Sequence, residues 1–153
     1  VQENSSHPVL GDVLEGTLGN GVDDKYELSN KMWSFLQAHR AKHTARGNGF
    51  GVQVKTVKDI SSTLTQRYYK DGAECIIDDG ISGRNPRRLT PRESARIMGF
   101  PDSFEIPVSN TQAYRQFGNS VCPPVVRAIG IQLIAMAVQS RQHDVPSSFR
   151  MDN

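Results

Sequence analysis

The chain has 153 residues, of which 37% are hydrophobic, and a formal net charge of +2 at pH 7. This length can bury the core of one domain, but so small a net charge does not by itself indicate a nucleic-acid-binding protein. Two cysteines without a C-x-x-C spacing argue against a disulfide framework, and without a signal peptide or a charge-free apolar run of membrane-spanning length we expect a cytoplasmic protein with no membrane partner.

The first part of the chain predicts a linker followed by a helix. Residues 1–27 are rich in Gly and Asp and sustain no hydrophobic period, so we interpret them as a linker with at most one short strand or turn. Ser29 is a favourable N-cap for a helix that runs to about His43, and Leu28 precedes it as a hydrophobic staple. The predicted core-facing stripe of this helix contains Met32, Trp33, Phe35 and Leu36.

The end of this helix and the loop after it form the first candidate nucleic-acid contact. Its basic last turns suit the helix dipole, and they suit a DNA phosphate equally well. The glycine-rich loop 46–51 lacks the Lys-Ser/Thr of a P-loop and leads into Gln53–Val57, whose alternation predicts a strand. The loop is either a hairpin connection or a place where the backbone approaches DNA, and we take Arg46 and Asn48 as candidate DNA contacts.

A second candidate contact follows between two predicted strand segments. Ser61–Leu64 begins one segment, Ala73–Ile77 predicts the next strand, and Asp71-Gly72 is a turn signal between them. The segment is either a hairpin tip with edge tyrosines or a groove-binding surface, because cations and tyrosines together suit phosphate, guanine and base stacking. The candidate DNA contacts here are Thr63, Leu64, Arg67, Tyr68, Tyr69 and Lys70.

The stretch from Thr90 onward predicts a short helix with a complete start. Thr90 caps it, Pro91 occupies the first helical position, and Glu93 closes a capping box. Gly99 ends the helix. We expect charged residues on and beside it to form a network that organises the neighbouring loops: Arg88, Arg92, Glu93 and Arg96.

The last part of the chain predicts two more helices. One starts at Ser109 or Asn110 and stops at Gly118. The longest runs from Pro123 to about Gln139 and is apolar on nearly every side, so it needs a surface to pack against. The polar tail, residues 140–153, is expected to fray.

The sequence offers no obvious metal site or nucleophile. His39 and His43 are four residues apart but have no cysteine or acidic ligand near them in the sequence, so we expect no metal. Cys75 lies among apolar neighbours, as core cysteines do. Cys122 precedes two prolines at a helix start, where the thiol pKa can fall, but nothing else there indicates catalysis.

Two motifs carry a resemblance to the DNA cytosine-5 methyltransferases. RRLTPRESARIMGFPDSF resembles the ninth conserved motif of that family, and SNTQAYRQFGNSV resembles the tenth, in the same order. Upstream, TLTQRYYKDGAECII resembles the target-recognition region of the Dcm-like subgroup, which methylates palindromes beginning with CC, and Thr63-Leu64 matches a pair that recurs there. The glycine-rich donor motif, the Pro-Cys nucleophile and the Glu-Asn-Val motif are missing.

The resemblance implies the C-terminal part of such an enzyme, inactive by itself. It implies double-stranded DNA as the partner and S-adenosylmethionine as the cofactor of the complete enzyme. It also implies that Asn119, Ser120 and Val121 line the methyl-donor pocket, although Ser120 could simply cap the next helix. The implied fold is mixed α/β: a loop-rich target-recognition domain with short antiparallel strands, and a C-terminal helix that packs on a Rossmann-like catalytic domain absent from this chain.

The implied organisation is a linker from the catalytic domain (1–27), a target-recognition domain with the ninth motif (28–107), the tenth motif with the returning helix (108–139), and the tail (140–153). Three hypotheses remain open: part of an enzyme chain, a separate DNA-binding subunit of a split enzyme, or a non-catalytic protein-interaction module. A DNA affinity that falls steeply with salt would argue against the third.

Overall fold

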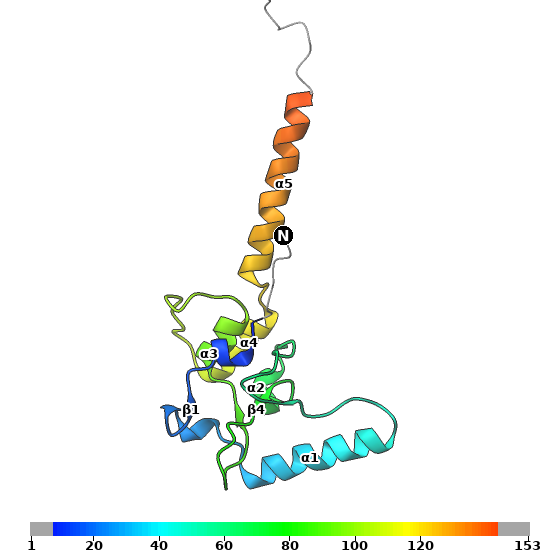
Figure 1. Cartoon of the computed structure of the whole chain (residues 1–153), viewed down its shortest axis with the longest axis vertical. Coiled ribbons are helices and arrows are strands. Elements are labelled where there is room, and N and C mark those ends of the chain that lie inside the picture. Colours follow the sequence, from blue (N-terminus) through cyan, green and yellow to red (C-terminus); the bar gives the residue numbers. More distant parts are fainter. Residues whose placement is uncertain (1–7, 144–153) are drawn as a thin grey trace, which may run out of the picture. The chain divides into compact units, whose positions relative to one another are not determined.

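The computed structural model describes residues 8–143, which fall into two compact units, one ending at Ser120 and the other beginning at Val121 (Figure 1). The secondary structure is mixed α/β, with short strands and helices, as the sequence predicts. Because the two units are separate bodies, each is described by itself.

The first unit contains a small three-stranded sheet whose pairing differs from the prediction. Its strands are β3 (Val54–Lys55), β4 (Ile76–Ile77) and β5 (Arg87–Arg88), in the order β3-β4-β5. Only β4 and β5 are antiparallel, whereas β3 and β4 run parallel. Residues 61–64 form no strand, so the hairpin considered between the Ser61–Leu64 segment and Ala73–Ile77 is not formed. Parallel neighbours need a crossover connection, and the one from β3 to β4 contains the short helix α2, Tyr68–Asp71.

Helix α1 spans Asn30–Ala45 and begins as predicted, with the Ser29 side chain accepting a hydrogen bond from the Met32 amide at 3.3 Å. Leu36 is its one buried residue. Met32 and Trp33 pack with Leu36 against Val52 and Ile76. Phe35 was expected in the same stripe, but its side chain is 58% exposed, because its position on the helix faces away from that cluster.

The segment interpreted as a linker is folded where the structure describes it. From residue 8 onward it contains η1 (Leu10–Asp12), β1 (Thr17–Leu18), β2 (Gly21–Val22) and η2 (Asp24–Tyr26). Its apolar residues are widely spaced and show no period, yet Leu10, Leu18, Val22 and Tyr26 are buried. Residues 8–27 thus contribute to the core, and residues 1–7 lie outside the described part.

Helices α3 (Pro91–Ile97) and α4 (Asn110–Asn119) complete the first unit. The Thr90–Glu93 capping box and the Ser109 cap are present, and Gly99 follows α3 with a φ of +81°. Helix α4 continues one residue past the predicted stop at Gly118. Tyr114 packs with Tyr68 in the main core cluster, and Phe117 packs with Ala95 beneath α3.

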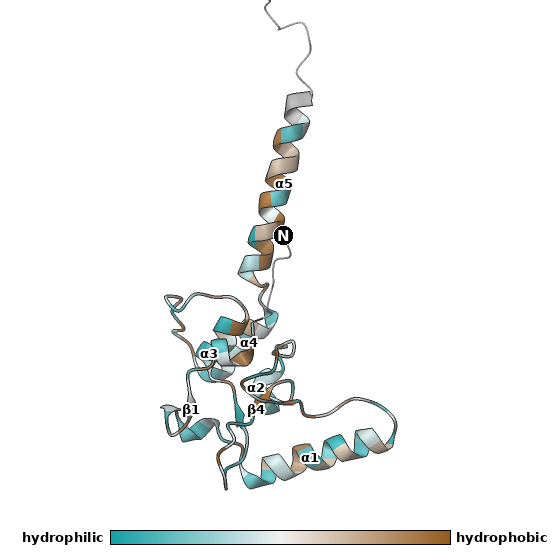
Figure 2. Cartoon of the chain, viewed as in Figure 1, coloured by the Kyte–Doolittle hydropathy of each residue, from teal (hydrophilic) through white to brown (hydrophobic). Residues whose placement is uncertain are grey.

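The second unit contains helix α5, Pro123–His143. Apolar residues recur along the helix (Figure 2), and Ile129, Leu133 and Ile134 are each more than half exposed. By length and composition alone, one stretch of the described chain could cross a membrane: an 18-residue window within Asn110–Ser140 has a mean hydropathy of 1.8. The stretch contains Arg127, so it is not a charge-free apolar run of the kind that the sequence prediction considered. Residues 144–153 of the predicted tail lie outside the described part.

Candidate nucleic-acid interface

An open cavity of about 570 Å³ brings the two candidate DNA-contact stretches together. Gly49, Phe50 and Gly51 of the glycine-rich loop line part of it. The rest of its lining comes mainly from the segment between β3 and β4: Ser62, Thr63, Thr65, Arg67, Lys70, Asp71, Ala73 and Glu74, with Gln53 beside β3. Phe50 is 71% exposed here, so an aromatic face, two cations and several hydroxyls share one surface. Such a set suits base stacking and phosphate contacts.

Three of the predicted contacts lie on this cavity and two are buried. Thr63, Arg67 and Lys70 are exposed and line it. Leu64 is 6% exposed and Tyr68 is 1% exposed, both within the main core cluster. The prediction that Leu64 and Tyr68 contact DNA is therefore wrong. Both side chains pack in the core and anchor the segment that carries the exposed residues.

Tyr68 has a structural role that its sequence neighbours do not reveal. Its hydroxyl donates to the Cys75 carbonyl at 2.8 Å and accepts from the Leu89 amide at 2.8 Å, which ties α2 to β4 and β5. Burial raises the pKa of Tyr68 well above its ordinary value, so the phenol stays protonated and keeps both hydrogen bonds. The next residue, Tyr69, is half-buried, and the Arg115 guanidinium lies 5.5 Å from the centre of its ring.

The remaining two predicted contacts lie at the end of α1, outside the cavity lining. Arg46 is exposed at the helix C-cap. Asn48 is held by its side-chain oxygen, which lies 2.8 Å from Nδ1 of His43, while Nε2 of His43 lies 3.2 Å from Nε2 of His39. Residues 8–143 contain no group of three or more potential ligands arranged for a metal ion.

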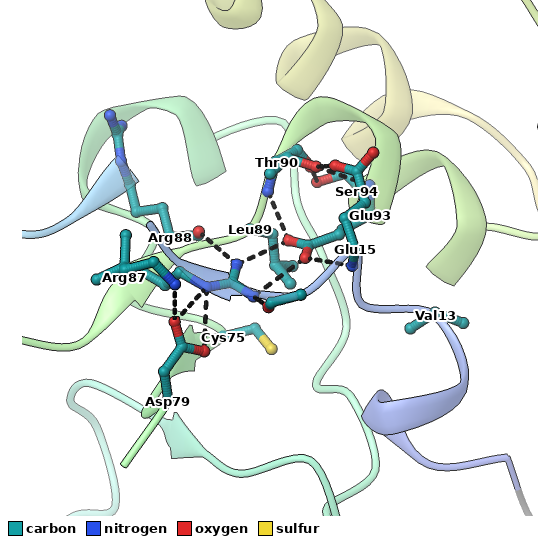
Figure 3. A network of polar contacts seen from close by, with 12 residues as sticks. Val13, Glu15, Cys75, Asp79, Arg87, Arg88, Leu89, Thr90, Glu93 and Ser94 are labelled. Carbon is teal, nitrogen blue, oxygen red and sulfur yellow. Dashed lines mark hydrogen bonds and ion pairs between the residues drawn. The ribbon is translucent and has the colours of Figure 1, made fainter. Parts of the chain in front are cut away.

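A buried ion-pair network is centred on Arg87 (Figure 3). Arg87 Nε donates to Asp79 at 2.9 Å, and its terminal nitrogens donate to Glu93 at 2.9 and 3.1 Å and to the carbonyls of Arg88 and Gly16. Burial alone would lower the pKa of Arg87, but hydrogen bonds and charge attraction from Glu93 and Asp79 outweigh it, so the pKa is raised. All five guanidinium donors are thereby satisfied, as a buried arginine requires.

The acidic members of this network join distant parts of the chain. Glu93 accepts from the backbone amides of Glu15 at 3.0 Å and Thr90 at 2.8 Å, and Asp79 accepts from the Leu18 amide at 2.9 Å. The side chains of Arg87 and Glu93 are fully buried. The network therefore fixes residues 15–18, β5 and the start of α3 to one another.

Four residues were predicted to organise this region, and each has a structural contact. Glu93 lies in the Arg87 network. Arg92 donates to the Phe104 carbonyl at 2.8 Å, and Arg96 binds the Asp102 carboxylate at 2.7 and 2.9 Å, so both hold the loop after α3. Arg88 forms no ion pair within residues 8–143, and its side chain donates to the Tyr69 carbonyl at 3.4 Å. The central residue, Arg87, was missed because adjacent arginines look alike in sequence.

The predicted donor-binding turn follows α4 directly. The Ser120 hydroxyl donates to the Phe117 carbonyl at 2.8 Å, so it caps the end of α4 rather than the start of the next helix. Asn119 is exposed, and its side-chain nitrogen lies 3.4 Å from the Gln66 side-chain oxygen. Val121 is 66% exposed at the start of the second unit.

Gly118 is the point where α4 meets the recognition segment. A Cβ built on it would lie 2.2 Å from the Thr65 carbonyl carbon and 2.4 Å from the Gln66 nitrogen. Only a glycine fits such a close approach of two backbones. Asn119, Ser120 and the wall of the cavity therefore belong to one packed structure within the first unit.

Comparison with solved structures first gives the fold class. The S. pombe Dnmt2 methyltransferase matches with a TM-score of 0.66 at 22% identity, over 90% of this chain and 44% of that one. The Entamoeba histolytica methyltransferase EhMeth matches with a TM-score of 0.55 at 19% identity, over 79% of this chain and 38% of that one. The fold is therefore that of part of a methyltransferase.

The sequence comparison then gives the family. Residues 1–135 match the C-5 cytosine-specific DNA methylase family, and the chain belongs to it. The type II methyltransferase M.NlaX of Neisseria lactamica is 50% identical over 82% of this chain and 39% of its own length. The DNA-cytosine methyltransferase of Escherichia coli is 45% identical over 80% of this chain and 32% of its own length. The chain thus spans about a third of the length of these relatives.

Proposed function

We propose that this chain is the C-terminal, DNA-recognising part of a DNA (cytosine-5-)-methyltransferase that acts on a CC-containing palindrome in a prokaryotic cytoplasm. The cavity that joins the glycine-rich loop to the Arg67–Lys70 segment is the observation that supports this proposal most directly. An exposed aromatic and two cations around one cavity are residue types that bind nucleic acid, and a DNA affinity that falls steeply with salt would argue against a protein-interaction module. A separate DNA-binding subunit of a split enzyme is the alternative.

In the proposed complete enzyme, this chain binds and orients the DNA duplex. The target base must leave the helical stack before it can react, so the duplex has to be held firmly on either side of it. Arg67 and Lys70 supply cations at the cavity, and Thr63 supplies a hydroxyl. The Arg87 network and Tyr68 hold this surface in place from the interior.

The family uses S-adenosylmethionine as its methyl donor, which supplies the methyl group when bound. The turn at Asn119 and Ser120 fits one edge of a donor pocket, with the exposed Asn119 amide as its polar group and Ser120 fixing the backbone. The remainder of that pocket, and the nucleophile, would come from the rest of the enzyme. Cys75 is fully buried, and burial raises the pKa of its thiol, so it is unsuited to nucleophilic attack.

The same proposal explains the exposed apolar surface of α5. A helix that exposes apolar residues on every side packs against another surface, and the Rossmann-like catalytic domain is the proposed one. Packing on a catalytic domain would explain the apolar composition of the window within Asn110–Ser140 without requiring a membrane.

Two experiments test the proposal. The chain alone, incubated with labelled donor and CC-containing duplex, is expected to transfer no methyl group, and stable label in the DNA would refute that.

In the complete enzyme, Arg67→Ala is expected to lose about 1–3 kcal/mol of discrimination at one G·C pair. Lys70→Ala is expected to weaken binding to every duplex and to flatten the salt dependence by about one unit. Equal weakening at every site by Arg67→Ala would make Arg67 a phosphate contact.

A further inference from the structure

Glu74 is a carboxylate on the cavity wall with one oxygen engaged and one oxygen without a donor. Its Oε1 accepts a hydrogen bond from the Thr65 hydroxyl at 2.6 Å. Its Oε2 is shielded from solvent and has no hydrogen-bond partner within the described part of the chain. A sheltered carboxylate oxygen without a donor costs free energy, so its presence calls for a physical explanation.

The cations beside it do not supply that donor. Arg67 and Lys70 line the same cavity, yet none of the ion pairs within residues 8–143 includes Glu74. Glu74 therefore has one carboxylate oxygen without an internal donor, in the lining of the cavity where the duplex is proposed to lie. Because Oε2 is shielded from solvent, contact with a base requires a change in the last torsion of the side chain, which is broad for glutamate.

We propose that Glu74 is a specificity-determining residue that accepts a hydrogen bond from the 4-amino group of a non-target cytosine in the major groove. Carboxylates recognise cytosine in this way, whereas a thymine at the same position presents a carbonyl oxygen that the carboxylate repels. This inference rests on the proposed function, since it names the base that the same cavity reads.

The neighbouring cation makes the choice of base pair more specific. A C·G pair presents the cytosine amino donor beside the two acceptors of guanine in the major groove. The cavity offers the complementary set, with the Glu74 carboxylate as acceptor and the Arg67 guanidinium as donor. Thr65 is a positioning residue, because its hydroxyl binds the other oxygen of the carboxylate.

The test is a double-mutant cycle between the protein and a base analogue, performed with the complete methyltransferase. Glu74→Gln keeps the size of the side chain and an oxygen for the Thr65 hydroxyl but removes the charge. In the duplex, 2-pyrimidinone replaces each non-target cytosine in turn and removes only its amino group. Affinities of both proteins are measured for every duplex and for a duplex with a single C·G to T·A change.

The parent enzyme is expected to bind one analogue duplex roughly tenfold or more weakly than the natural site. Glu74→Gln is expected to bind the natural site weakly and to lose nothing further with that analogue, because the contact is already missing. Thr65→Val, which keeps the charge but removes the tether, is expected to lose part of the discrimination at the same position, which keeps the test informative if Glu74→Gln folds poorly.

Two results would overturn the inference. If Glu74→Gln weakens all duplexes equally and shows no coupling to any amino group, Glu74 is a structural acceptor only, and the proposed function still stands. If the parent enzyme shows no preference for any CC-containing site, the proposed function fails and the inference fails with it.

Discussion

Gly118→Ala adds one methyl group at the closest contact between α4 and the recognition segment. The new Cβ would lie 2.2–2.4 Å from the carbonyl group of Thr65 and the amide nitrogen of Gln66, where ordinary contact needs 3.4–4 Å. The two backbones would have to separate by more than about 1 Å. Because Tyr114 on the same helix packs on Tyr68, with ring centroids 5.3 Å apart, this movement would also loosen the main core.

The expected loss of stability follows from two opposing contributions. Overpacking a well-packed contact costs about 1–3 kcal/mol, and more where backbone must move, whereas alanine in a helix gains about 1 kcal/mol over glycine. Because backbone must move here, we expect an overpacking cost of about 3–4 kcal/mol, which leaves a net loss of about 2–3 kcal/mol in the free energy of unfolding and a fall of about 8 °C in melting temperature. Thermal and urea unfolding of the chain, followed by circular dichroism, measure both quantities.

Gly49→Ala is the matched control. Gly49 has no positive φ, and a Cβ there would meet nothing within 4 Å, so stability should change by less than about 0.5 kcal/mol. If Gly118→Ala melts within about 2 °C of the parent while Gly49→Ala behaves as expected, the close approach of α4 to residues 65–66 does not exist in solution, and the argument from that contact is wrong.

Three further predictions concern the buried network, the cysteines and α5. Arg87→Met leaves Glu93 buried without its partner and should cost about 3–5 kcal/mol in urea unfolding, whereas Arg84→Ala, at an exposed ion pair, should cost less than about 1 kcal/mol; similar losses would contradict the network's role. A thiol reagent should modify Cys122 quickly in the folded chain but Cys75 only after unfolding, because Cys75 is fully buried and burial raises its thiol pKa; rapid titration of both would argue against that burial. The chain by itself should self-associate and bind a hydrophobic dye, because α5 exposes apolar residues, and Leu133→Glu should reduce both effects. A monomer by sedimentation that binds no dye would refute this.

Local chemistry was sufficient for the capped helix starts and for the end of α3. The Thr90–Glu93 capping box, the caps at Ser29 and Ser109 and the stop at Gly99 all depend on residues within a few positions of one another. Such signals do not need the rest of the fold. The sequence motifs likewise predicted the family that residues 1–135 match.

Tertiary structure decided which of two similar neighbours is buried. Arg87 and Arg88 are adjacent on β5, and Arg87 is fully buried because Glu93 and Asp79 reach it from other parts of the chain. Tyr68 and Tyr69 differ in the same way, since only Tyr68 can bond both Cys75 and Leu89. Composition cannot separate such pairs, because their partners are distant in sequence.

The sequence by itself determined the family, the capped helices and the stretches that supply the candidate interface. Only the tertiary structure decided the parallel pairing of β3 with β4. That pairing places the segment considered as a hairpin tip in a crossover connection. That crossover buries Tyr68 and Leu64 and leaves Arg67, Lys70 and Glu74 on one cavity with the glycine-rich loop. Strand direction depends on which distant segments share hydrogen bonds, and no local signal in residues 53–77 specifies that choice.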